Sequence, residues 1–317
     1  NYNFVQKTLH DLLLSNNFIK KSLYEIEKIL FLKKKKNQIQ NEKHIFITGL
    51  PRSGTTALLN FLYDTNQFSS FTYENMPFVM APNFFSKIKT SSNFQKRERF
   101  HQDGIFYDLK SPEAFDEIFF STFNENEIKE ELTNFVSLIL LNKKHKRYLS
   151  KNNLNYKRID IIQTIFPNSI FLIPFREPLQ HAYSLFKQHI HFIKLQNQNE
   201  FIRRYMNYLG HNEFGKNHKS WNIPKSNNNY NDLNYWLEQW LLFYDKIFKR
   251  YRNYKNCYFV NFENLEKINY IQKLLKVLDL HQKPNFQFKI NIKEISDTFD
   301  KDLYLNASNL YEQIKLI

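Results

Sequence analysis

The chain has 317 residues, and its 45 Lys and Arg against 31 Asp and Glu give a formal net charge of +14. A hydrophobic fraction of 42% with 17% aromatic residues excludes a disordered chain, and the length suits one large α/β domain. The only cysteine, Cys257, excludes an intrachain disulfide and a cysteine-rich metal site. We expect a single domain over 1–317, with a helical lead-in (1–40), a core (about 44–262) and C-terminal helices (264–316).

The basic charge does not by itself indicate a nucleic-acid partner. Lysines occur together with many Asn, Ile, Phe and Tyr, a bias that AT-rich coding DNA produces without selection for a partner. The longest basic run, Lys33–Lys36, follows a helical segment and is typical of a solvated helix end. Apolar stretches are short and interrupted by charge, so we expect no membrane span and a cytoplasmic protein, with peripheral membrane association left open.

Apolar periodicity divides the chain into alternating helices and short apolar strands. Helices are predicted over 2–36, 57–62, 125–146, 156–166, 178–191, 232–250, 264–279 and 302–316. Strands are predicted over 44–49, 147–151, 169–175 and 257–262. The stretches 68–123 and 197–231 read as irregular, and long irregular stretches commonly carry binding loops.

Strands separated by helices predict a parallel sheet with helices on both faces, a three-layer α/β sandwich similar to the P-loop nucleotide triphosphatases. Ligands of such sheets bind beyond the carboxyl ends of the strands. Arg52, Lys151 and Arg176 each follow or end a predicted strand, so we expect all three at this edge.

The stretch from Gly49 to Thr56 is typical of a phosphate-binding loop between a strand and a helix. The N–H groups at a helix start, together with the helix dipole, attract an anion. The spacing nearly matches the nucleotide triphosphatase loop, but Thr55 stands where that loop has its lysine, which argues against a triphosphate ligand. Arg52 supplies an earlier cation that could clamp a phosphate or sulfate.

Two segments together resemble the sulfotransferases that use 3′-phosphoadenosine 5′-phosphosulfate. The first is Pro51–Thr56 after an apolar strand. The second is Arg176, followed two residues later by Pro178 and eight residues later by Ser184. Their order, and their positions at two strand-to-helix junctions, make the pair more specific than either segment alone.

The resemblance implies a transfer of the sulfuryl group from this nucleotide to an acceptor hydroxyl by in-line displacement. It implies that the 3′-phosphate is bound by Arg176 and Ser184. The residues implied to bind the 5′-phosphosulfate are Arg52, Ser53, Gly54, Thr55 and Thr56. Lys151 resembles the family lysine that contacts the transferring group, and with Arg52 it would serve the leaving phosphate. No metal is expected.

The general base is left between two residues. Glu74 resembles the glutamate that tyrosylprotein and several bacterial sulfotransferases place after the first helix, and partial burial could raise its pKa toward neutrality. His101 is the alternative, because histidine titrates near neutral pH without help. The segment 211–215 reads as a polar loop near the acceptor, and the histidine spacings make a metal site improbable.

One departure from the family concerns the C-terminal part of the chain. The glycine-rich segment ending in lysine that cytosolic phenol and steroid sulfotransferases carry there is missing, so the adenosine pocket must be completed differently. The acceptor is left as a carbohydrate, a lipid or a tyrosine, and no oligomeric state is indicated. The alternatives are a P-loop nucleotide kinase or hydrolase and, with less support, a basic nucleic-acid-binding protein.

Overall fold

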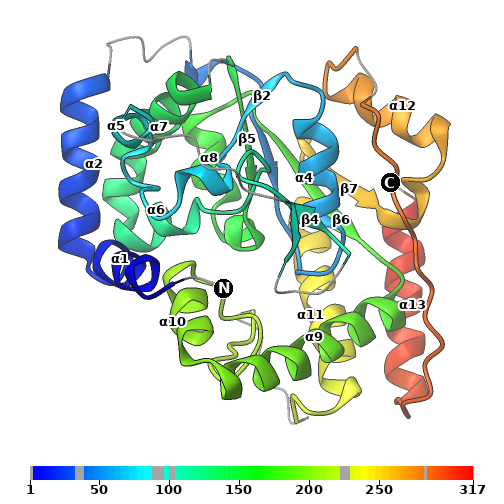
Figure 1. Cartoon of the computed structure of the whole chain (residues 1–317). Coiled ribbons are helices and arrows are strands. Elements are labelled where there is room, and N and C mark those ends of the chain that lie inside the picture. Colours follow the sequence, from blue (N-terminus) through cyan, green and yellow to red (C-terminus); the bar gives the residue numbers. More distant parts are fainter. Residues whose placement is uncertain are drawn as a thin grey trace.

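The computed structural model describes residues 3–32, 39–87, 96–99, 104–143, 145–221, 229–281 and 284–316. A five-stranded sheet in the order β2-β5-β1-β6-β7 forms its centre, and every neighbouring pair of strands in it is parallel (Figure 1). Its strands are β1 (Ile45–Ile47), β2 (Phe68–Ser69), β5 (Arg147–Lys151), β6 (Ile170–Phe175) and β7 (Cys257–Asn261). A separate antiparallel pair joins β3 (Arg97–Glu98) to β4 (Phe106–Tyr107).

Helices follow most of the strands and account for most of the remaining described chain. In chain order they are α1 (Phe4–Leu14), α2 (Asn17–Phe31), α4 (Thr55–Tyr63), α5 (Pro82–Ser86), α6 (Glu117–Thr122), α7 (Glu125–Lys143), α8 (Ile159–Ile165), α9 (Pro178–Gln198), α10 (Glu200–Tyr208), α11 (Leu233–Tyr251), α12 (Ile268–Val277) and α13 (Lys301–Lys315). Single turns of 3₁₀ helix cover η1 (Tyr73–Asn75), η2 (Asn153–Lys157) and η3 (Phe262–Asn264).

Both faces of the sheet are buried, as expected for a parallel sheet between helices. Side chains alternate along β1: Ile45 and Ile47 join a core cluster with residues of α4 and α12, whereas Phe46 joins a larger cluster with residues of α7, α8, α11 and α13. The alternation of two cores along one strand confirms the predicted three-layer α/β fold.

Three predicted segments differ from the structure. Of the lead-in expected over 2–36, residues 3–32 are described, and they form two helices, because the side chain of Asn16 accepts a hydrogen bond from Phe18 N and caps a new helix there. Helix α9 continues to Gln198 and α10 follows, where a loop was expected from 197. The irregular stretch 68–123 contributes an edge strand, β2, which pairs with β5.

The parallel topology brings three separate segments to one edge of the sheet. The loop after β1, the last residue of β5 and the turn after β6 all lie at its carboxyl end, because Ile47 pairs with both Lys151 and Leu172. Within the described residues, no helix is both long and apolar enough to span a bilayer.

Candidate active site

A cavity of about 820 Å³ opens at this carboxyl edge. Its lining includes Arg52, Gly54, Thr55, Thr56, Lys151, Arg176 and Ser184, seven of the residues predicted from the sequence. Its volume lies within the range typical of small-molecule sites. The two segments that resemble the sulfotransferase motifs thus face one space.

The loop between β1 and α4 forms the floor of the cavity. Gly54 is the N-cap residue of α4 and has φ 99°, and no side chain caps the helix there. A Cβ on Gly54 would lie 2.2 Å from Cδ2 of Phe262, so only glycine lets this loop approach the chain after β7. The first N–H groups of α4 therefore keep an uncapped helix start beside the cavity.

Two buried side chains hydrogen-bond to the backbone of this loop. Ser53, which was predicted to bind the donor, is fully buried and donates a 2.7 Å hydrogen bond to Leu50 O. Its side chain is not among the residues lining the cavity. His181 Nε2 lies 2.8 Å from Pro51 O, and burial lowers the pKa of His181 to about 3, so its neutral ring donates this bond.

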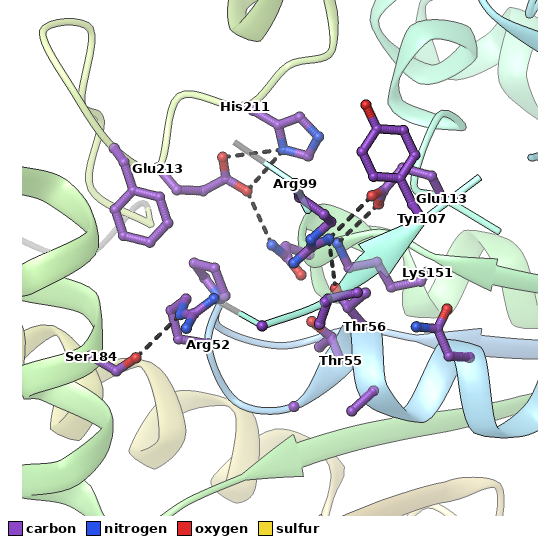
Figure 2. A pocket seen from close by; sticks show the side chains of 18 of the residues that line it. Arg52, Thr55, Thr56, Arg99, Tyr107, Glu113, Lys151, Ser184, His211 and Glu213 are labelled. Atoms are coloured by element: carbon purple, nitrogen blue, oxygen red, sulfur yellow. Dashed lines mark hydrogen bonds and ion pairs between the residues drawn. The ribbon is translucent and has the colours of Figure 1, made fainter. Parts of the chain in front are cut away.

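Arg52 connects the two predicted phosphate-binding segments. Its Nε donates a 3.2 Å hydrogen bond to Ser184 Oγ on α9 (Figure 2), and Arg176 Nη1 donates to Arg52 O at 3.3 Å. Arg176 is largely buried over the ring of Phe262, and its Nε has no hydrogen-bond partner among the described residues, only a 3.9 Å ion pair with Glu263. A buried guanidinium with an unused donor suits an additional anionic partner.

The roof of the cavity carries a buried charged group that the sequence did not indicate. Glu113 accepts from Arg99 Nη1 at 3.2 Å and from Tyr73 Oη at 2.6 Å, and its other oxygen lies 3.9 Å from Lys151 Nζ. Burial alone would raise the pKa of Glu113, but Lys151 and Arg99 outweigh it, and the pKa is held well below its usual range. Arg99 also donates to Thr56 Oγ1 at 3.4 Å, which ties this group to the floor.

Burial would raise the pKa of Glu113, but it lowers the pKa of Lys151. The carboxylate of Glu113 opposes this lowering. Lys151 is only 6% exposed and ends β5 beside the loop of β1. The carboxylate of Glu113 thus compensates a lysine charge held at the position predicted from the sequence.

A histidine and a glutamate line the cavity from the loop after α10. His211 Nδ1 lies 3.4 Å from the carboxylate of Glu213, which also accepts from Asn153 Nδ2 at 3.1 Å. Burial raises the pKa of Glu213, but His211 more than offsets it and the pKa falls to about 2. Figure 2 shows this pair approaching the cavity from a different element than Thr55 and Thr56. An imidazole oriented by a buried carboxylate is the usual arrangement of a general base.

Of the two predicted candidates for the base, only Glu74 is among the described residues. Glu74 is on η1, its Oε2 pairs with Lys143 Nζ at 3.4 Å, and it is not among the described residues that line the cavity. Its neighbour Tyr73 occupies the cavity side of that turn. His101 lies outside the described residues.

The C-terminal segment closes the side of the cavity next to Arg176. Phe286, Phe288, Lys289 and Lys293 line it, and Gln180 on α9 exchanges two hydrogen bonds of 2.9 Å with the backbone of Lys293. This segment belongs to the C-terminal part of the chain, which lacks the family's glycine-rich stretch. No periodic pattern marks it, so sequence reasoning missed it. Over the described residues, no cluster of three or more His, Cys, Asp or Glu side chains could hold a metal ion.

Comparison with solved structures identifies the same fold. A sulfotransferase, STF1 of Mycobacterium tuberculosis, matches with a TM-score of 0.52 at 11% identity, over 99% of this chain and 86% of that one. STF9 of Mycobacterium avium matches with a TM-score of 0.47 at 11% identity, over 95% of this chain and 75% of that one. No curated protein sequence matches.

The family comparison covers most of the residues that line the cavity. Residues 44–213, more than half of the chain, match the model described as the sulfotransferase family. They include the loop after β1, Lys151, Arg176 and Ser184, and they end at Glu213. The chain belongs to the sulfotransferase family.

Proposed function

We propose that the protein transfers a sulfuryl group from 3′-phosphoadenosine 5′-phosphosulfate to an acceptor hydroxyl. The observation that carries this proposal is the link through Arg52. Its Nε donates a hydrogen bond to Ser184 Oγ, and its carbonyl oxygen accepts one from Arg176 Nη1. Two segments that are separated by more than 120 residues thereby form one cationic site.

Three parts of the donor nucleotide fit the residues present. The uncapped start of α4 and the side chains of Arg52, Thr55 and Thr56 would hold its 5′-phosphosulfate. Arg176, with its unused buried donor, and Ser184 would hold its 3′-phosphate. Phe262, Phe286 and Phe288 offer aromatic faces for the adenine. The donor supplies an activated sulfate whose leaving group is a phosphate.

The transfer requires one bond to form and one to break. The acceptor oxygen bonds to sulfur, the bond from sulfur to the 5′-phosphate oxygen breaks, and the acceptor proton leaves to a base. Negative charge grows on the leaving phosphate, and Lys151 with Arg52 would stabilise it. Glu113 keeps Lys151 in place in a buried site that would otherwise disfavour its charge.

We assign the general base to His211 in preference to Glu74. His211 lines the cavity, Glu213 orients its Nδ1, and within the described chain Nε2 has no hydrogen-bond partner. Glu74 instead pairs with Lys143 outside the cavity lining. His211 would accept the acceptor proton on Nε2, and Glu213 would stabilise the imidazolium that forms.

The proposal is tested by donor turnover. Formation of 3′-phosphoadenosine 5′-phosphate from the labelled donor is measured with a mixture of alcohol, sugar and tyrosine-peptide acceptors. Lys151→Ala should lower the rate about 100-fold or more, the usual cost of removing one transition-state charge partner, while Lys273→Ala, an exposed lysine on α12, should leave it unchanged. Full activity of Lys151→Ala, or hydrolysis of ATP with magnesium in place of donor turnover, would contradict the proposal.

The base assignment has a test of its own. His211→Gln should lower kcat by about 100-fold or more and leave donor binding unchanged, whereas Glu74→Gln should keep kcat. The reverse pattern would return the base role to Glu74.

A further inference from the structure

Apolar side chains predominate at one end of the cavity, where Lys7, Asn199 and Tyr205 also line it. Its wall is formed by the second half of α9, by α10 and by the loop that follows α10. The residues are Phe192, Phe201, Ile202, Met206, Leu209 and Phe214. Each is less than 9% exposed, so this wall lies deep in the molecule.

The wall is a consequence of helical spacing along α10. Phe201, Ile202, Met206 and Leu209 follow one another at intervals of one, four and three residues, which places them on one face of the helix. The opposite face carries Arg203, whose guanidinium pairs with Glu200 on the surface. The apolar face of α10 is therefore turned toward the cavity.

The apolar wall lies away from the predicted donor site. Ser184 and Phe192 are on the same helix, α9, and eight residues of α-helix span roughly 12 Å. Figure 1 shows α9 running from the side of α13 to the side of α10. The cavity thus has a cationic end at Ser184 and an apolar end at α10.

The loop after α10 places polar and apolar groups next to one another in the same cavity. Leu209 and Phe214 belong to the apolar wall, and His211 and Glu213 between them form the polar pair. A molecule that placed a hydroxyl at His211 would rest its body against this wall. The apolar wall has one charged neighbour among the described residues of α1 that line the cavity. This is Lys7, whose Nζ lies 5.6 Å from the centroid of the Phe201 ring.

We infer that the acceptor is an apolar alcohol, a molecule with one reactive hydroxyl on an extended hydrocarbon body. This inference rests on the proposed function, and it selects the lipid class from the carbohydrate, lipid and tyrosine classes left open by the sequence. A sugar needs many hydrogen-bond partners, and burying its hydroxyls against such a wall would leave them unpaired. An apolar body has no hydrogen bonds to lose there, and the burial of its surface against the wall is favourable.

The test uses straight-chain primary alcohols of four to ten carbons, compared with a methyl glucoside and a tyrosine peptide. Alkyl sulfate and 3′-phosphoadenosine 5′-phosphate are measured by mass spectrometry, and binding of the latter nucleotide is measured separately by calorimetry. We expect kcat/KM to rise about fourfold for each added methylene, the effect of burying one CH₂ group. Decanol should exceed both the glucoside and the peptide.

A pair of matched variants locates the effect. Met206→Gln keeps a straight side chain but adds an amide to the wall, and it should flatten the rise with chain length. Leu274→Gln makes a similar change in a buried residue of α12 that does not line the cavity, and it should keep the rise.

Each remaining outcome has a defined meaning. Nucleotide binding with faster transfer to the glucoside or the peptide, or with no chain-length dependence, would overturn the inference and leave the proposed function standing. Absence of nucleotide binding would overturn both.

Discussion

Gly54 shows how one residue controls the floor of the cavity. Its positive φ and the 2.2 Å that would separate an added Cβ from Phe262 both require glycine. Gly54→Ala should weaken binding of 3′-phosphoadenosine 5′-phosphate at least tenfold and lower the free energy of unfolding by about 1–3 kcal/mol, the usual cost of overpacking. Calorimetry and chemical denaturation measure the two effects.

A matched control for this change is Gly104→Ala. Gly104 also lines the cavity, but an added Cβ there would meet nothing within 4 Å. If Gly54→Ala and Gly104→Ala weaken nucleotide binding equally, the close approach to Phe262 is not the cause of the weaker binding.

Asp116 is a buried carboxyl whose ionisation works against the fold. Burial raises its pKa to about 6, although Tyr148 and Ser150 donate hydrogen bonds to it. Because the folded state holds this proton more tightly than the unfolded state, the contribution of Asp116 to stability falls as pH rises from about 4 to about 6, by roughly 3 kcal/mol.

Asp116→Asn removes this titration. The variant should therefore gain roughly 3 kcal/mol relative to the wild type between pH 4 and pH 7, measured by denaturation at both values. A stability difference that stays constant with pH would show that Asp116 is not protonated in the folded protein.

The loop after α10 is positioned as a unit by contacts outside the cavity. Gly210 has φ 69°, and an added Cβ would lie 2.4 Å from Cγ of Glu117, whose carboxylate is fixed by two 2.8 Å hydrogen bonds from Arg158. Gly210→Ala should displace the neighbouring His211 and lower kcat at least tenfold with nucleotide affinity retained. Equal losses in kcat and in nucleotide affinity would mean that the change spreads to the floor.

Elements with strong local signals could be predicted from the sequence, and elements that depend on distant contacts could not. The strands before Arg52 and Arg176 are continuous apolar runs, and their place in the sheet follows from the parallel topology. Helix α10 was missed because its exposed face is polar and its apolar face, seen in sequence, resembles scattered hydrophobic residues in a loop. Edge strand β2 has only two residues, Phe68 and Ser69, and pairing with β5 defines it.

The site follows the same division. The residues proposed to bind phosphate lie in or just after the turns that follow β1 and β6 and carry motif spacing, so most of their positions on the cavity could be predicted. Arg99 and Glu113 meet Lys151 only through tertiary folding, and no local pattern marks them. Glu213 is two residues from His211 in a loop that the sequence placed near the acceptor, but its position on the cavity depends on the fold. Glu74 was placed by resemblance alone, and the turn of η1 directs Tyr73 to the cavity in its place.

At the scale of the whole molecule, several buried histidines make the fold sensitive to acid. Burial lowers the pKa of His44 and of His189 to about 4 and that of His181 to about 3. Since an unfolded histidine takes up its proton near pH 6.5, each contribution is complete above that pH and is lost as pH falls, by roughly 2 kcal/mol at pH 5. Together they outweigh the opposite effect of Asp116.

The free energy of unfolding should therefore fall by several kcal/mol between pH 7 and pH 5, as denaturant titrations at each pH would measure. His44→Gln removes one of the three histidine titrations and should reduce this loss by about a third. The amide can still accept a hydrogen bond from Tyr148 N and donate one to Ile39 O, as the ring does. Unchanged stability down to pH 5 would contradict the buried neutral state of these rings.

The proposed sulfuryl transfer requires that the cavity bind the donor nucleotide without metal. Calorimetric titration with 3′-phosphoadenosine 5′-phosphate, beside ADP and ATP with magnesium, tests this most directly, in the wild type and in Arg176→Ala and Ser184→Ala. We predict micromolar binding of the bisphosphate without magnesium, abolished in Arg176→Ala and weakened in Ser184→Ala, with Lys273→Ala unaffected. Binding of ATP with magnesium in the absence of bisphosphate binding would contradict the account and assign the loop after β1 to a nucleoside triphosphate.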